Sequence, residues 1–131
     1  MKAIVCVDEK LGMCFNHRRQ SRDALVINDI IKRAEGQEIY MSPYSAMLFE
    51  GFDKIVARED YLECAPEEGV CFIEREDVPK NITELVLYKW NRHYPQDKAL
   101  GIDLSTGWEK ISSEDFVGHS HEIITREEYK R

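Results

Sequence analysis

Lys2-Ala-Ile-Val-Cys-Val7 is the stretch that decides the fold. Its apolar residues follow one another without alternation, and charged residues flank the run on both sides. A strand of this composition is typical of a position that is buried on both faces, as in the centre of a parallel sheet. We therefore expect residues 2–7 to lie in the middle of the sheet.

After a loop that contains Gly12, apolar residues recur with the period of an amphipathic helix. They are Val26, Ile27, Ile30, Ile31 and Ala34. Ser21 is the expected N-cap, with Asp23 in the first turn. Lys32 and Arg33 suit the last turn, and Gly36 suits the position just after the helix.

The rest of the chain predicts alternating strands and helices, followed by a β-rich end. We expect strands at Glu38–Met41, Lys54–Ala57, Val70–Ile73 and residues 85–90, and weaker ones at Leu100–Leu104, Lys110–Val117 and His121–Thr125. Helical segments are expected from the Ser42 N-cap and Pro43 to Gly51, and at Glu59–Cys64. This order predicts one α/β domain over residues 1–131, with a parallel core, antiparallel C-terminal strands and helices on both faces.

Composition narrows the classes of partner. The 131 residues are 43% hydrophobic and 33% charged, with a net charge of −7, so we expect no nucleic-acid partner. No apolar run approaches the roughly 20 residues of a membrane helix. The N-terminus lacks the pattern of a secretory signal, and none of the four cysteines forms a Cys-x-x-Cys pair. We therefore expect a cytoplasmic protein that does not contact membranes.

Several stretches resemble dihydrofolate reductase. Gly12-Met13 followed by Asn16 is similar to that family's mobile loop, and residues 38–45 resemble its strand leading into the cofactor-phosphate helix. Leu85-Val-Leu87 and the tail from Trp108 through Gly118-His-Ser-His121 fall where the family has its late strands. The resemblance implies a dihydrofolate reductase-like mixed sheet of reduced size, and it places Asp23 near the family's catalytic acid.

Departures from the family pattern concern the cofactor. Glu74-Arg75 stands where the family has Gly-Gly beside the nicotinamide, and Ser42-Pro43 stands for its Gly-Arg. Side chains at the first place occupy cofactor space, and proline removes an N–H from the anion site at the second. The helix after residue 73 is also expected to be short, over Glu76–Thr83. We therefore expect no cofactor.

The run from Gly12 to Arg22 also resembles short bacterial proteins that carry an automatic ribonuclease Z label. That enzyme needs a His-x-His-x-Asp-His cluster and further ligands to hold two zinc ions. Only four histidines are present here, His17, His93, His119 and His121. The sequence therefore predicts no metal-dependent nuclease.

Basic residues cluster before the first helix. Asn16-His17-Arg18-Arg19-Gln20-Ser21-Arg22 places three arginines at a helix N-terminus, where cations oppose the helix dipole. An anion bound by Arg18, Arg19 and Arg22 would explain this placement. The alternative is that these arginines pair with surface carboxylates.

Two later clusters carry rings and further charges. Lys89–Tyr94 offers Trp90 and Tyr94 for stacking and Asn91, Arg92 and His93 for polar contacts, although core packing alone can explain the indole. His119 and His121 would share one side of an extended segment, which suits a metal pair, but no third ligand is nearby.

The fold implied by the resemblance would bring these three clusters to one rim. We therefore expect a domain that binds a small anionic ligand, nucleotide-like or pterin-like. The expected ligand-binding residues also include Ser42, Tyr44 and Ser45, and the candidate proton-transfer residues are Asp23, His93 and His121. The alternatives are an active reductase or hydrolase, or a module that binds an acidic protein or forms a homodimer.

Overall fold

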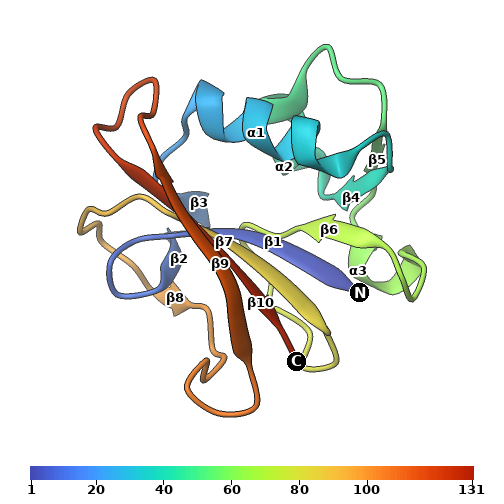
Figure 1. The fold of residues 1–131 in the computed structure, drawn as a ribbon. Helices are drawn as coiled ribbons and strands as arrows, with labels where there is room; N and C mark the ends of the chain where they lie inside the picture. The colour runs from blue at the N-terminus through green and yellow to red at the C-terminus, as the bar shows by residue number, and fades with distance from the viewer.

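A seven-stranded sheet forms the centre of the computed structural model, which describes all residues from 1 to 131 (Figure 1). Its strand order is β5-β4-β6-β1-β7-β10-β9. The strands are β1 (Lys2–Val7), β4 (Ile39–Met41), β5 (Ile55–Ala57), β6 (Val70–Phe72), β7 (Glu84–Lys89), β9 (Glu109–Phe116) and β10 (Ile124–Lys130). Neighbours from β5 through β7 are parallel, whereas β10 is antiparallel to β7 and β9. The central place of β1 and the mixed sheet are both as expected.

Each face of the sheet packs a separate apolar cluster, because successive β1 side chains point in opposite directions. Ile4 packs with Val26 and Ile30 of helix α1 (Ala24–Ala34), on the face that also carries α2 (Pro43–Ala46) and the 3₁₀ turn η1 (Met47–Phe49). Val5 packs on the other face with Tyr61, which belongs to α3 (Tyr61–Cys64). Helices on both faces are therefore confirmed, although α3 is a single turn.

A second, three-stranded sheet occupies the segment expected to be a loop. Its order is β3-β2-β8, formed by β2 (Gly12–Phe15), β3 (Arg18–Arg19) and β8 (Lys98–Ala99). Asn16 and His17 have φ angles of 52° and 60°, which match the two-residue turns that join tight hairpins. The prediction of a loop was wrong because this hairpin has no alternating apolar pattern.

Both ends of α1 differ in detail from the prediction. Its N-cap is Asp23, whose side chain accepts from the Leu25 N–H, and not Ser21. Its left-handed C-cap is Glu35, and Gly36 follows with a φ of 83°. Lys32 and Arg33 do lie in the last turn. In α2, Ser42 is the N-cap and Pro43 is the first helical residue, as expected.

Two predictions about the second half were wrong. Residues 76–83 form no helix, and the short strand near residue 100 is Lys98–Ala99 rather than Leu100–Leu104. The last strand extends beyond the expected end at Thr125, to Lys130. Arg126 and Glu127 are buried there, paired with charges of neighbouring elements. The sequence shows no apolar strand pattern here, because buried ion pairs take the place of apolar contacts.

The longest helix, α1, has 11 residues, and no helix is long and apolar enough to span a bilayer.

Candidate functional site

Asp8 organises the loops at the carboxyl ends of β1 and β7. Its side chain is fully buried and accepts hydrogen bonds from the N–H groups of Lys10 at 2.9 Å and Gly12 at 2.8 Å. It also accepts from Nε2 of Gln20 at 3.2 Å and from the Tyr94 N–H at 3.3 Å. Sequence reasoning missed this residue, although an acid directly after a buried strand was the available signal.

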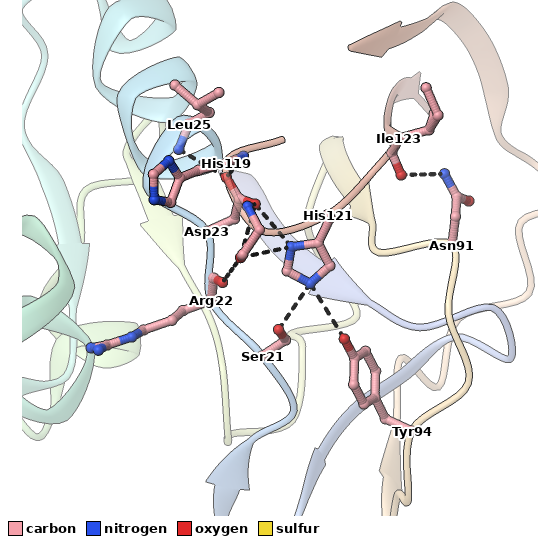
Figure 2. Close-up of polar contacts among 10 residues, drawn as sticks. Ser21, Arg22, Asp23, Leu25, Asn91, Tyr94, His119, His121 and Ile123 are labelled. Carbon is pink, nitrogen blue, oxygen red and sulfur yellow. Dashed lines mark hydrogen bonds and ion pairs between the residues drawn. The ribbon is translucent and has the colours of Figure 1, made fainter. Parts of the chain in front are cut away.

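Asp23 and His121 form a buried pair at the same end of the sheet (Figure 2). Nδ1 of His121 lies 2.8 Å from Oδ2 of Asp23, and the two residues are 4% and 3% exposed. The carboxylate also accepts from the N–H groups of Leu25, His119 and Ser120, each at 2.9 Å. Burial alone would raise the pKa of Asp23, but these hydrogen bonds together hold it well below its ordinary value.

The second ring nitrogen of His121 faces two hydroxyl groups. Nε2 lies 2.9 Å from Oγ of Ser21 and 3.3 Å from the Tyr94 hydroxyl (Figure 2). Because an ionised carboxylate only accepts, the proton of a neutral His121 belongs on Nδ1, and Nε2 is then an acceptor. Trp90 stacks on the imidazole, with ring centres 4.7 Å apart and planes at 24°. Sequence reasoning had assigned Ser21 only a capping role.

Two hollows open beside this group. The larger, of about 460 Å³, is a groove between α1 and η1. Its lining includes Arg22, Asp23, Ile27, Met47 and His119. The smaller, of about 240 Å³, lies between the β2–β3 hairpin and the loop after β7, and its lining includes Asn16, Arg18, Arg19 and Tyr94. The three arginines of the basic cluster thus separate into two sites.

Glu74 anchors a polar cluster beside the smaller hollow. The side chain is 8% exposed and receives both Nε and Nη2 of Arg19, at 2.8 and 3.0 Å, and Oγ of Ser45 at 2.7 Å. The Tyr44 ring lies under the guanidinium groups of Arg19 and Arg75, at 4.1 and 3.8 Å from its centre. The charge of Arg19 is therefore engaged within the protein.

Some other residues of the sequence hypothesis lie away from this group. His93 is 59% exposed and lies 4.0 Å from Glu9, and Arg92 and His17 are also exposed. Asn91 donates to the Ile123 carbonyl and joins the two late loops. Trp90 packs with the core of its face. Ser42 is buried as the cap of α2.

The structure does bring parts of all three sequence clusters together, through the contacts of Ser21, Tyr94 and His121. One residue of each cluster therefore lies in this group, whereas the arginines line separate hollows. No group of three or more His, Cys, Asp or Glu side chains is arranged to hold a metal ion.

Comparison with known proteins identifies the architecture. No protein-family model and no curated protein matches the chain, and the ribonuclease Z resemblance gains no support. The structure is similar to dihydrofolate reductase from Enterococcus faecalis, described as complexed with NADP(H) and RAB-propyl. The TM-score is 0.65 with 16% identity, over 99% of this chain and 95% of that chain. The fold is therefore dihydrofolate reductase-like, and identity at this level shows the fold alone.

Proposed function

We propose that this dihydrofolate reductase-like domain binds a small anionic ligand with a flat apolar body, nucleotide-like or pterin-like, in the groove between α1 and η1. The observation that carries the proposal is the groove itself, which joins apolar walls to a cationic end. The domain does so without a nicotinamide cofactor.

Size and position favour this groove over the other hollows. Its volume of about 460 Å³ lies within the roughly 300–1,000 Å³ of small-molecule sites, whereas the hollow beside Tyr94, at about 240 Å³, does not. A third hollow of about 430 Å³ includes Lys2 and Val70, at the amino ends of β1 and β6. Ligands of open α/β sheets bind outside the carboxyl ends of the strands, which is where Asp23 places the groove.

Side chains of the groove suit an anion attached to an apolar ring system. Ile27 and Ile31 of α1 face Met47 of η1, whose side chain is 80% exposed. Arg22 and His119 lie at the Asp23 end of the groove, and neither side chain has an ion-pair partner in the protein. Glu50 also lines the groove, so the anion is expected at the end formed by Arg22 rather than along its whole length.

The cluster around Glu74 supports the absence of a cofactor. Glu74 and Arg75 stand at the position where the resembling family leaves backbone open to nicotinamide. Here the Glu74 carboxylate is held by Arg19 and Ser45, and Arg75 lies on the Tyr44 ring. A cofactor would have to displace an ion pair whose carboxylate is buried, and leaving that charge unpaired is costly.

Methyl NMR provides the test, because Met47 is the one methionine that lines the groove. Met47 is exposed there, while Met13 and Met41 are 3% and 0% exposed and serve as internal references. With ¹³C-methyl methionine, we expect AMP or dihydrofolate to shift the Met47 signal in a saturable manner. Arg22→Gln should weaken that binding by about tenfold, as expected for loss of a charge-assisted contact.

Arg18→Gln is the matched control, since Arg18 lines the hollow beside Tyr94. This variant should bind AMP and dihydrofolate as tightly as the unmodified chain does. An unshifted Met47 signal at millimolar concentrations of both compounds would contradict the proposal. Equal weakening by Arg18→Gln and Arg22→Gln would place the anion outside the groove.

A further inference from the structure

Ser21, His121 and Asp23 are aligned as a proton-transfer chain. Oγ of Ser21 lies 2.9 Å from Nε2 of His121, and Nδ1 of the same ring lies 2.8 Å from Oδ2 of Asp23. We propose that Ser21 is the nucleophile of an acyl-transfer site that hydrolyses small carboxylic esters, with His121 as general base and Asp23 as the positioning residue. This activity goes beyond ligand binding in the groove and does not depend on it.

The hydrogen bonds of Asp23 determine the direction in which the proton moves between Ser21 and His121. Asp23 already accepts three backbone N–H groups, which keep it ionised and fixed in place. It therefore holds the proton of a neutral His121 on Nδ1 and leaves the Nε2 lone pair toward Ser21. The Ser21 contact is the shorter of the two at Nε2, 2.9 Å against 3.3 Å for Tyr94.

Exposure to solvent increases from Asp23 and His121 to Ser21. Asp23 and His121 are buried, while Ser21 is partly exposed. Trp90 covers one face of the imidazole and favours the imidazolium form that the reaction creates. Only the attacking atom thus needs to meet a substrate, as nucleophilic catalysis requires.

Backbone donors are available for the negative charge that develops on the carbonyl oxygen. The N–H groups of Arg22 and Ala24 donate to no acceptor in the protein. Arg22 directly follows the nucleophile, and the N–H after a nucleophilic serine commonly stabilises the oxyanion. Residues 18–20 line one hollow and residues 22–24 the other, so Ser21 lies between the two along the chain.

The reaction balances with water as the only co-substrate. Oγ of Ser21 adds to the ester carbonyl carbon while Nε2 of His121 takes the Oγ proton, and the ester C–O bond then breaks as Nε2 returns the proton to the departing alcohol. Water next adds to the acyl carbon and gives a proton to Nε2. The bond from the acyl carbon to Oγ breaks, Oγ regains the proton, and the carboxylic acid leaves.

A fluorophosphonate probe tests the assignment directly, because it bonds covalently to activated serines. Intact-mass and peptide mass spectrometry should show one adduct, on Ser21. Ser21→Ala should abolish the adduct, and His121→Gln should slow its formation by about 100-fold or more. Ser113→Ala, at an exposed serine of β9, is the matched control and should label like the unmodified chain.

Circular dichroism should confirm that each variant is folded, and Ser21→Ala removes only a partly exposed hydroxyl. Hydrolysis of p-nitrophenyl butyrate is expected to fall in parallel with labelling. Absence of an adduct on the folded unmodified chain would overturn the proposal, as would an adduct on Tyr94 or labelling that does not depend on His121.

Discussion

The carboxylate of Asp23 lies directly against Gly118. A Cβ atom on Gly118 would lie 2.7 Å from Oδ2 of Asp23 and 2.9 Å from the carbonyl oxygen of His121. This close approach lets the loop between β9 and β10 present the His119 and Ser120 N–H groups to the carboxylate. A residue without a side chain is therefore a condition for the buried pair.

Gly118→Ala should destabilise the fold by about 2 kcal/mol, because the added methyl group must push against backbone and a fixed carboxylate. Urea unfolding followed by circular dichroism measures the change. Gly107→Ala is the control: its site is open, and only its φ of 77° opposes alanine, at a cost of about 1 kcal/mol. If both variants lost the same free energy of unfolding, the loop between β9 and β10 could move to make room for the methyl group.

Asp23→Asn should lower the free energy of unfolding by about 3 kcal/mol at pH 7, because the amide NH₂ that replaces one carboxylate oxygen cannot accept the hydrogen bonds that this oxygen receives. The folded-state pKa of Asp23 is depressed, so its contribution is complete above the unfolded-state pKa of about 3.9 and is lost as pH falls below it. At pH 2.5 the difference between the two proteins should therefore be smaller by about 2 kcal/mol.

Urea unfolding at both pH values checks this linkage. Asp53→Asn is the control, since the exposed Asp53 carboxylate has no hydrogen-bond or ion-pair partner in the protein, and the variant should follow the unmodified chain at both values. A stability difference for Asp23→Asn that stays constant down to pH 2.5 would contradict the assigned ionisation.

Glu74→Gln should destabilise the fold by about 2 kcal/mol, because the partly buried Arg19 guanidinium loses its charged partner. In the double variant Arg19→Met with Glu74→Gln, part of that loss should return. The coupling energy from the four unfolding curves is expected to be about 2 kcal/mol. Additive effects would show that the pair does not act as a unit.

Arg126→Met should destabilise the fold by about 3 kcal/mol, since it leaves Asp29 without its cation. Arg126 is buried and bonds Asp29 at 2.8 Å and Glu114 at 2.7 Å, and the Tyr88 hydroxyl also donates to Asp29. Arg58→Met removes an equally short but exposed pair with Asp60, and thermal unfolding should detect no change. A similar shift in both variants would remove the distinction.

Strong local patterns made much of the architecture predictable. The run from Lys2 to Val7 identified the central strand, and the helical period through Val26 and Ile30 identified α1. Ser42 and Pro43 marked the start of α2 through the chemistry of capping. These signals depend on residues close together in the chain, so no knowledge of tertiary contacts was needed.

Long-range contacts explain what the sequence did not reveal. Asp23 and not Ser21 is the N-cap, because residues 119–121, far along the chain, donate further hydrogen bonds to the Asp23 carboxylate. Asp23 and His121 were each predicted as proton-transfer residues, but nothing local could show that they are paired. The burial of Arg126 could not be predicted from local sequence, because its partner Asp29 lies on α1, 97 residues earlier in the chain.

We propose that the Glu74 cluster occupies the place that a nicotinamide cofactor would take, and calorimetric titration of NADPH into the protein tests this most directly. We expect NADPH to bind no more tightly than AMP, whose adenosine phosphate it shares, and Arg22→Gln to weaken the binding of both to the same extent. Stoichiometric binding with a micromolar Kd would contradict it, because the Arg19–Glu74 pair could not then remain in place.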